Sequence, residues 1–329
     1  MKIALDAMGG DHAPKEIVEG ALLALTLYPD LEKIYLVGKT EEIEPHINSD
    51  HQKIEIIQAS EVIEMDDHPA LAYRKKKDAS MTVAARLVKE GKADALISAG
   101  NTGGQMTASL FVMGRIKGIS RPGIATVLPS LQGYMLLLDA GANADASAEN
   151  LKQFAMMGSI YAEKILKKDK PKVALINIGS EKTKGNELTI KAYEELEKME
   201  GINFTGNIEG REIPEGQADV IIADGFTGNI VLKLMEGMGK SLSTMLKNEI
   251  TSSFIAKIGA LLMKDALLGF KKKLDYKEIG GAPLLGVDGI SIICHGSSDR
   301  TAIQNAIRVA IECKKENYIG EIKERIAKE

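Results

Sequence analysis

Short runs of Ile, Val and Leu alternate with longer stretches of helical pattern along most of the chain. The runs are continuous and not alternately apolar and polar, which is typical of strands buried on both faces. Strands that alternate with helices predict an α/β fold with a doubly wound, mostly parallel sheet. The predicted strands are 3–5, 33–37, 53–58, 95–98, 124–128, 135–138, 173–177, 220–223 and 290–293, and the clearest helices are 15–27, 82–90, 149–166 and 187–199.

No low-complexity linker divides the chain, so residues 1–329 are predicted to form a single α/β domain. The stretch 230–276 stands apart, because it has a helical pattern and no predicted strand. We therefore expect a helical segment attached to that domain.

The composition argues against several classes of protein. Hydrophobic residues make up 44% of the chain and charged residues 27%, as in ordinary soluble proteins. The net charge of −4 argues against a nucleic-acid partner. No apolar run approaches the roughly 20 residues of a membrane span, and a strand at the start predicts no signal peptide. Cys294 and Cys313 form no disulfide framework or metal cluster, so we expect a cytoplasmic protein without metal or cofactor.

Six predicted strands end in small, polar, glycine-rich loops. Two of these loops belong to near-copies, since ADALISAGNTG at 93–103 aligns without a gap on ADVIIADGFTG at 218–228. Ligands of open α/β sheets bind beyond the carboxyl ends of the strands, where glycine lets backbone N–H groups approach them. Any turn favours such residues, but six loops favour an anion-binding site. The loops are LDAMGGD (5–11), SAGNTGG (98–104), LLDAGAN (137–143), NIGSEKTKGNE (177–187), ADGFTGN (223–229) and CHGSSD (294–299).

Missing motifs narrow the identity of the anion. The chain lacks the phosphate loop G-x-x-x-x-G-K-[ST] and the G-x-G-x-x-G fingerprint after a strand, which argues against a nucleotide. Lys182 and Lys184 bring positive charge to one strand-end loop, so a small phosphate is favoured. The alternative for each lysine is an ordinary solvated loop face.

The search for an activated nucleophile finds little. The chain has no G-x-S-x-G elbow and no H-E-x-x-H. Cys294 and His295 are adjacent at a strand end, but neighbours along a strand point to opposite faces. We therefore expect Cys294 in the core and His295 facing the site.

The loops and their flanks contain seven motifs in chain order, which are DAMGGDHAP, RxKK followed by SM, SAGNTG, LLDxGAN, GxExxKGNE, DGFTGN and GGAPLLGVDG…HGSS. Together, from residue 3 to about residue 310, they resemble the bacterial phosphate acyltransferases of phospholipid synthesis. The resemblance implies transfer of a fatty acyl group from acyl carrier protein to inorganic phosphate. It also implies a homodimer and a fold similar to phosphotransacetylase and the isocitrate dehydrogenase group. The chain departs from the family pattern at Gly104-Gln105, where Ala and an apolar residue are usual, and at Ala79, where Ser is usual.

The resemblance agrees with the missing nucleophile, because phosphate is itself an anionic nucleophile at neutral pH. What remains for the protein is to position the reactants and stabilise the oxyanion of the thioester carbonyl. We hypothesise that Lys184 holds phosphate, that Asp224 orients Lys184 or a water, and that His295 borders the thioester. The hypothesised catalytic residues are Lys184, Asn186, Asn101, Thr102, Asp224, Asn229 and His295. The hypothesised substrate-binding residues are Gly9, Gly10, Ser98, Gly100, Gly103, Asn143, Gly185, Thr227, Gly228, Ser297, Arg74, Lys75 and Lys76.

Two surfaces are interpreted as partner sites. The RKKK run at 74–77 is a candidate docking site for the acidic carrier protein, although cations also stabilise an exposed helix end. In 252–274, positions 254, 258, 261, 262 and 265 are predicted to share one helical face, with lysines around it. That face could lie in the core or a dimer interface, but delivery of an insoluble acyl phosphate favours an anionic membrane surface. We therefore expect peripheral attachment to the inner face of the cell membrane, where a membrane glycerol-3-phosphate acyltransferase is a possible partner.

Two other functions stay open from the sequence. A short-chain phosphate acetyl- or butyryltransferase that uses coenzyme A would perform the same chemistry. A non-catalytic module that binds phosphate or acyl carrier protein would give one stoichiometric event instead of turnover.

Overall fold

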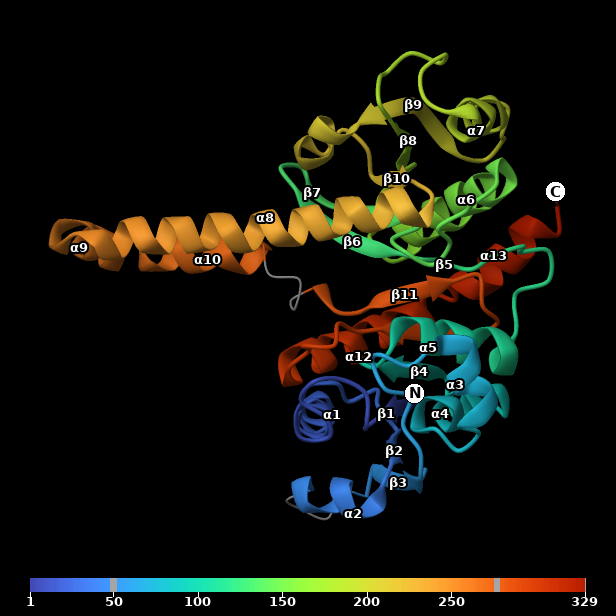
Figure 1. Cartoon of the computed structure of the whole chain (residues 1–329), viewed down its shortest axis with the longest axis vertical. Coiled ribbons are helices and arrows are strands. Elements are labelled where there is room, and N and C mark those ends of the chain that lie inside the picture. Colours follow the sequence, from blue (N-terminus) through green and yellow to red (C-terminus); the bar gives the residue numbers. More distant parts are fainter. Residues whose placement is uncertain (48–51, 275–278, 329) are drawn as a thin grey trace.

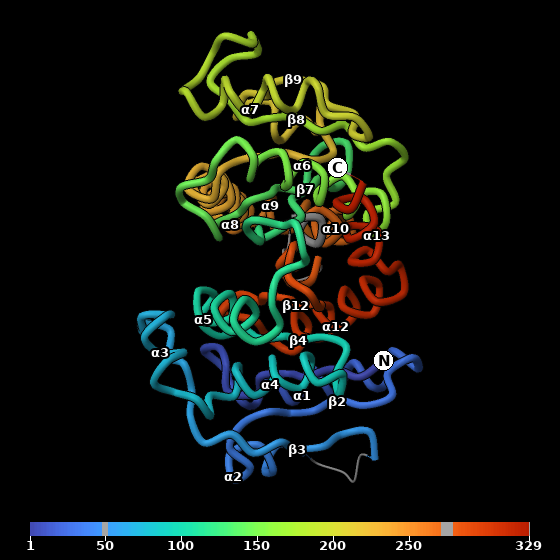
Figure 2. The backbone as a smooth tube through the Cα atoms, turned by 90° about the vertical axis from the view of Figure 1, so that its right-hand side faces the viewer, coloured from blue at the N-terminus to red at the C-terminus, as the bar shows by residue number. Residues whose placement is uncertain are grey.

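The computed structural model describes residues 1–47, 52–274 and 279–328, and Figure 1 shows two sheets that lie one above the other. The chain passes directly between them, since Ala125 alone separates β5 (Gly123–Ile124) from β6 (Thr126–Ser130). Figure 2 shows the same division from the side.

The lower sheet of Figure 1 has seven strands in the described part of the chain. They are β1 (Lys2–Asp6), β2 (Lys33–Gly38), β3 (Ile54–Gln58), β4 (Ala95–Ser98), β5, β11 (Ala282–Leu285) and β12 (Ile290–Ile293). Their order is β3-β2-β1-β4-β12-β11-β5, and neighbours are parallel from β3 to β12. β11 is antiparallel to both β12 and β5.

The upper sheet has five strands among the described residues. They are β6, β7 (Gly133–Leu138), β8 (Lys172–Asn177), β9 (Asn203–Glu209) and β10 (Val220–Ile222). In the order β6-β7-β10-β8-β9, only β6 is antiparallel to its neighbour.

Helices cover both faces of the lower sheet, because alternate residues of β1 belong to different cores. Ile3 and Leu5 belong to the core that contains α1 and α12 residues, whereas Ala4 belongs to the core that contains α4 residues. The helices are α1 (Lys15–Leu27), α2 (Thr40–Ile43), α3 (Pro69–Lys75), α4 (Ser80–Lys89), α5 (Thr102–Ala108), α6 (Ala148–Lys164), α7 (Glu187–Glu197), α8 (Gly225–Ser252), α9 (Phe254–Leu262), α10 (Lys264–Leu274), α12 (Arg300–Lys315) and α13 (Tyr318–Ile326). The described residues also form short 3₁₀ helices η1 (Glu44–His46) and η3 (Gly210–Glu215) and a π-helix η2 (Ser109–Met113).

The predicted α/β class with mostly parallel strands is confirmed. The sequence prediction missed β9 and β11. β11 carries Pro283, which cannot donate to a sheet ladder and so weakens the pattern of a strand. The predicted strand 124–128 is divided between the two sheets as β5 and β6.

The segment α8–α10, called the arm below, projects from the body of the molecule (Figure 1). α9 lies at its far end, and α10 turns back toward the body. Of the five positions predicted to share one helical face, 254, 258, 261 and 262 all lie in α9, but the prediction is wrong for position 265, because α9 ends at Leu262 and Met263 separates it from α10. Asp265 therefore belongs to a different helix from Phe254 and Ile258.

Candidate active site

The sheet orders divide the six polar loops into two groups. β1, β4 and β12 are neighbours in the lower sheet, so the loops after Asp6, Ser98 and Ile293 lie together. β7, β10 and β8 are neighbours in the upper sheet, so the other three loops form a second group. Both views place the loop between β8 and α7 at the top of the molecule and α5 in its lower half.

A buried carboxylate joins three elements beneath the lower loops. Asp6, at the end of β1, accepts hydrogen bonds from the hydroxyls of Ser80 on α4 and Ser98 on β4, each at 2.6 Å. Burial raises the pKa of Asp6, and these hydrogen bonds oppose that shift. A Cβ on Gly9 would lie 2.7 Å from the backbone nitrogen of Gly100, so the loops after β1 and β4 cross in contact that requires glycine.

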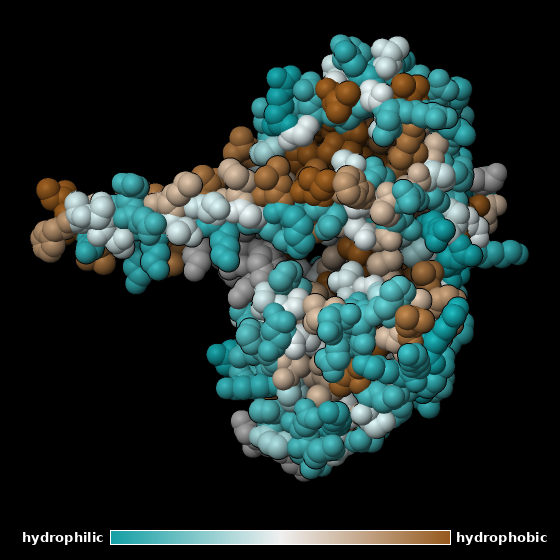
Figure 3. Space-filling model, in the orientation of Figure 1, coloured by the Kyte–Doolittle hydropathy of each residue, from teal (hydrophilic) through white to brown (hydrophobic). Residues whose placement is uncertain are grey.

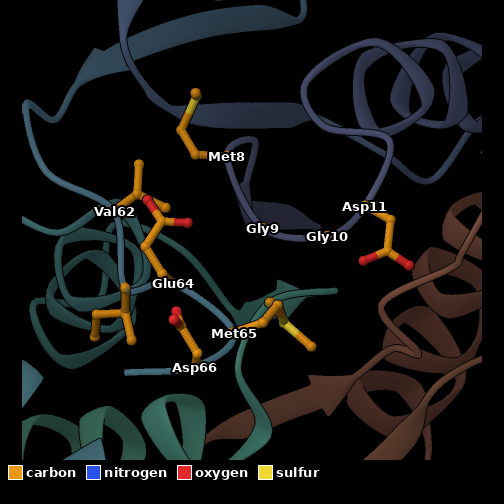
Figure 4. Close-up of a pocket in the computed structure, with 10 residues that line it drawn as sticks. Met8, Gly9, Gly10, Asp11, Val62, Glu64, Met65 and Asp66 are labelled. Carbon is orange, nitrogen blue, oxygen red and sulfur yellow. The ribbon is translucent and has the colours of Figure 1, made fainter. Parts of the chain in front are cut away.

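A pocket of about 330 Å³ opens at this crossing (Figure 4). The hypothesised binding glycines Gly9, Gly10 and Gly100 line one side of it. Glu64 and Asp66, from the loop after β3, line the other side, and Figure 4 shows their carboxylates on the wall opposite the two consecutive glycines. This acidic wall was not predicted, because EVIEMDD at 61–67 contains no glycine to mark a ligand loop.

Asn101 connects α5 to the acidic wall. Its Oδ1 accepts a hydrogen bond from the backbone N–H of Gly104 at 2.9 Å and so caps α5. Its Nδ2 donates toward the backbone oxygens of Glu64, Met65 and Asp67 at 3.0, 3.0 and 3.2 Å. The side chain of Asn101 is thereby held by its own protein, whereas Thr102 beside it is exposed.

The two departures from the family pattern lie close to these loops. Gln105 is fully buried and donates from Nε2 to the Ser291 hydroxyl and to the Ile292 oxygen of β12, at 3.1 and 2.9 Å. Ala79 is the residue before α4 and gives that helix no side-chain cap, which a Ser at this position could supply.

Asp139 organises the upper loops. Its Oδ2 accepts hydrogen bonds from the backbone nitrogen and the Nδ2 of Asn143 at 2.7 and 2.9 Å. Its Oδ1 accepts from the backbone N–H of Ile124 at 3.0 Å, which fixes the loop to β5. A Cβ on Gly225 would lie 2.7 Å from the Asn143 backbone, and one on Gly228 only 1.8 Å from the Asp139 oxygen, so α8 begins in tight contact with this loop.

Two more of the hypothesised catalytic residues cap helices, as Asn101 does. Asp224 caps α8 by accepting from the backbone nitrogen and the hydroxyl of Thr227, at 2.9 and 2.8 Å. Asn186 caps α7 by accepting from Thr189 N at 2.9 Å. No ion pair joins Asp224 to Lys184 within the described residues. Asn229 is exposed and lies beside Gly141.

The two loop lysines differ in their surroundings. Lys182 forms an ion pair with Glu197, and its Nζ lies 5.5 Å from the centre of the Tyr193 ring. Lys184 is exposed and has no carboxylate partner in the part of the chain that the structure describes. Gly185 follows at a φ of +103°, and a Cβ there would lie 2.1 Å from Thr189 Oγ1, so this turn next to Lys184 requires glycine.

Cys294 and His295 have opposite environments. Cys294 is buried, and burial raises the pKa of its thiol to about 12, so it is not a thiolate at neutral pH. His295 is exposed, and its Nδ1 lies 2.8 Å from the Ser297 hydroxyl and accepts from Ser297 N at 3.1 Å. Ser297 therefore orients the imidazole of His295 within the loop between β12 and α12.

The basic run on α3 is only partly available to a partner. Arg74 and Lys75 are exposed. Lys76 turns inward, where its Nζ lies 2.5 Å from Asp67 Oδ2 and 2.7 Å from the Val62 oxygen.

The described residues contain no group of three or more His, Cys, Asp or Glu side chains arranged to hold a metal ion. No described helix has both the length and the apolar character needed to cross a membrane.

Solved structures share this arrangement of two sheets. A phosphotransacetylase from Streptococcus pyogenes superposes with a TM-score of 0.65 over 95% of this chain and 94% of its own, at 18% identity. A branched-chain phosphotransacylase from Enterococcus faecalis V583 gives a TM-score of 0.57 over 95% and 98%, at 14% identity. At these identities the likeness shows the fold alone, and it places the chain among α/β proteins of the phosphotransacetylase fold.

The sequence comparisons are more specific. A phosphate acyltransferase from Heliobacterium modesticaldum is 57% identical over 99% of this chain and 98% of its own. One from Bacillus pumilus is 52% identical over 100% and 98%. The family model described as fatty acid synthesis protein matches residues 1–320. The chain belongs to this family of phosphate acyltransferases, which confirms the resemblance that its seven motifs carry.

Proposed function

We propose that this enzyme moves a long-chain fatty acyl group from acyl carrier protein to inorganic phosphate, and that the acyl phosphate serves phospholipid synthesis. The names of its relatives support phosphate as the acceptor. The observation that carries the mechanism is the burial of Cys294, the cysteine of the strand-end loops, which raises the pKa of its thiol to about 12 and leaves no thiolate nucleophile there at neutral pH. An enzyme whose acceptor is already anionic needs no such nucleophile.

In the proposed reaction, a phosphate oxygen bonds to the thioester carbonyl carbon and forms a tetrahedral intermediate. The intermediate collapses with cleavage of the carbon–sulfur bond. The thiolate leaves with that electron pair and takes a proton from solvent. The protein therefore has to hold two reactants in contact and stabilise one oxyanion.

We assign the roles according to which side chains are free to reach a substrate. Lys184 is proposed to hold phosphate, because it is exposed and has no carboxylate partner among the described residues. Thr102 and Asn229 are proposed donors, since each is exposed at the start of a helix that follows a strand. Asn101 and Asp224 are proposed to hold their loops in place, because their side-chain oxygens are engaged in caps.

The test of the reaction uses palmitoyl-acyl carrier protein with inorganic phosphate. We expect phosphate-dependent release of thiol and an acyl phosphate that hydroxylamine traps. A stable acyl adduct on Cys294 during turnover would exclude direct attack by phosphate. Turnover with acetyl-coenzyme A and none with palmitoyl-carrier protein would favour the short-chain enzyme, and a single stoichiometric event would favour a binding module.

The two loop lysines give a matched test of the phosphate role. Lys184→Ala should lower kcat/KM by about 100-fold, as loss of one preorganised charge commonly does. Lys182→Ala should cost far less, because Lys182 pairs with Glu197. Both variants should unfold in urea at the parent midpoint. Equal and small losses of activity would remove Lys184 from the phosphate site.

We further propose that the arm serves both a homodimer and an anionic membrane surface. An exposed apolar stripe runs along α8 at spacings of three or four residues, which suits helix packing against a second copy of the chain. The stripe consists of Ile230, Leu234, Met238, Leu242, Met245 and Leu246. Figure 3 shows apolar residues along the arm and at its end.

The end of the arm is the proposed membrane contact. No residue of α9 is buried, and Phe254, Ile255 and Leu262 are 78%, 82% and 85% exposed. Phe254→Glu combined with Ile255→Glu should abolish binding to vesicles of anionic lipid and leave the dimer and soluble turnover intact. Leu131→Glu, at an 85% exposed site off the arm, is the control. A double variant that dissociates or unfolds, beside a parent that ignores vesicles, would contradict the membrane contact.

A further inference from the structure

A stacked aromatic pair, of which Phe111 is exposed and Tyr73 half-buried, lies on the surface that α3 shares with the residues after α5. The rings of Tyr73 and Phe111 stack at 5.3 Å between centroids and 19° between planes. Phe111 is 70% exposed, and Leu71 on α3 is 50% exposed. Phe111 belongs to the π-helix η2, an irregularity that is frequent at functional sites.

One cation lies over this pair, and two more follow Tyr73 in the sequence. The Nζ of Lys77 lies 4.5 Å from the centre of the Tyr73 ring, within the range of a cation–π contact. Arg74 and Lys75 are exposed, and neither they nor Lys77 have a carboxylate partner in the described part of the chain. The whole chain carries a net charge of −4, whereas Arg74, Lys75 and Lys77 give this surface a local positive charge.

This surface is continuous with the pocket. α3 begins directly after the loop that forms the acidic wall, and a Cβ on Gly103 of α5 would lie only 2.5 Å from Pro69, the first residue of α3. Lys76 joins the end of α3 to that loop, because its ammonium donates hydrogen bonds to the Val62 oxygen and to Asp67. A partner seated on α3 and η2 is therefore held next to the mouth of the pocket.

We propose that Leu71, Tyr73, Arg74, Lys75, Lys77 and Phe111 form the docking surface for acyl carrier protein, with Phe111 as its apolar anchor. The inference rests on the proposed function, which supplies an acidic protein as acyl donor. Charge complementarity gives the encounter, since cations at the rim steer an acidic partner. An exposed aromatic ring with cations around it has the composition of an interface hot spot. Lys76 is excluded from the surface, because its ammonium is half-buried and already paired with Asp67.

The experiment compares two acyl donors that share the same thioester arm. Palmitoyl-carrier protein carries the docking partner, whereas palmitoyl-pantetheine is the arm alone. Phe111→Ala and the double variant Arg74→Glu with Lys75→Glu should each raise the KM for palmitoyl-carrier protein by about 10-fold at unchanged kcat. Both should leave turnover of palmitoyl-pantetheine at the parent value. The charge variant should also flatten the dependence of KM on salt.

Matched variants separate docking from folding. Phe111→Tyr keeps the ring and should restore the parent KM. Leu131→Ala and Lys198→Glu remove an exposed apolar residue and an exposed cation elsewhere, and should change nothing. An unchanged KM for palmitoyl-carrier protein in the variants would overturn the proposal. An equal loss with both donors would overturn it too, because it would place these residues in the active site or the fold.

Binding of the carrier protein without turnover tests the surface independently of the reaction. Fluorescence anisotropy of labelled holo-carrier protein should show weaker binding to Phe111→Ala by about 10-fold. Binding that the parent shows and the variants keep would overturn the docking surface even if the enzyme is active. A parent that binds the carrier protein through these residues but turns over neither donor would instead contradict the proposed function.

Discussion

The near-copies 93–103 and 218–228 begin alike in the structure. Asp94 accepts from the backbone N–H of Lys2, the first residue of β1, at 2.8 Å, and Lys314 lies 3.1 Å away. Asp219 accepts from the backbone N–H of Lys172, the first residue of β8, at 2.9 Å, with Lys168 at 3.1 Å. Each aspartate thus ties the start of its strand to the start of a parallel neighbour.

The same two copies end differently. In the first, Asn101 caps a helix that begins at Thr102. In the second, Asp224 caps a helix that begins at Gly225, two residues earlier in the aligned string. Helix α8 therefore begins two residues earlier than α5 in the alignment. The aligned threonines take different helix positions, since Thr102 is the first residue of α5 and Thr227 is the third residue of α8.

The position of the capping residue explains the shift. In the first copy, Asn101 precedes the threonine and accepts from the backbone N–H of Gly104. In the second copy, Asp224 precedes the first glycine and accepts from the backbone N–H of Thr227. As a result, Asp224 engages both the N–H and the hydroxyl of Thr227, whereas Asn101 engages neither group of Thr102. Two copies of the pattern G-x-T-G can therefore differ in which of their groups a helix cap engages.

The largest expected difference between the copies concerns their last matched glycines. A Cβ on Gly228 would lie 1.8 Å from the backbone oxygen of Asp139, whereas one on Gly103 would lie 2.5 Å from the ring of Pro69 on a short surface helix. Gly228→Ala should lower the free energy of unfolding by about 3 kcal/mol or more, because backbone must move. Gly103→Ala should cost about 1 kcal/mol, since α3 can shift. Urea unfolding measures both.

A third glycine is the control for this pair. Gly237 lies in the same helix as Gly228, and a Cβ there would meet nothing within 4 Å. Gly237→Ala should be neutral or stabilise the protein by up to about 1 kcal/mol, as expected from helix propensity. If Gly228→Ala behaves like Gly237→Ala, the contact with Asp139 does not fix the start of α8.

The second largest expected difference in stability concerns the two capping residues, Asn101 and Asp224. Asn101→Asp keeps the capping oxygen but turns the three carbonyl contacts of Nδ2 into repulsion, so it should cost about 2 kcal/mol of unfolding free energy. Asp224→Asn keeps the cap of α8 and should cost only a few tenths of a kcal/mol. Similar losses in both variants would show that the amide of Asn101 does not hold the pocket wall.

Much of the fold could be predicted, because the apolar runs of a parallel sheet are continuous and fix most of its strands. The positions of most strands and of the helices between them followed from this pattern. The split of 124–128 between two sheets could not, since one residue, Ala125, separates the two strands. β11 was missed because Pro283 contradicts the local pattern of a strand.

The candidate site was less predictable, because residue type does not reveal which atoms are already engaged. Asn101, Asp224 and Asn186 were all hypothesised to be catalytic from the sequence, and the structure shows that each side chain caps a helix. Lys182 and Lys184 look alike in sequence, and only the structure shows that Glu197 neutralises one of them. The pairing of Phe111 with Tyr73 joins residues far apart in the chain, for which the sequence offers no signal.

The smallest expected effect concerns the matched aspartates at the start of the copies. Burial of Asp94 raises its pKa, but the hydrogen bond from Lys2 and the nearby Lys314 outweigh this and hold the pKa below its ordinary value. A carboxyl group whose pKa is lowered by folding contributes stability above its unfolded pKa of about 4, and this contribution is lost as the pH falls through the folded pKa. Asp94→Asn should therefore cost about 0.5 kcal/mol at pH 7, as expected for an ion pair that is half-buried on the Asp94 side and exposed on the Lys314 side, and the difference from the parent should shrink below pH 4. Asp219→Asn should cost a similar amount at pH 7, since its contacts have the same geometry. Urea unfolding at pH 7 and at pH 3.5 checks both, and a loss in one variant only would show that the two copies are not anchored alike.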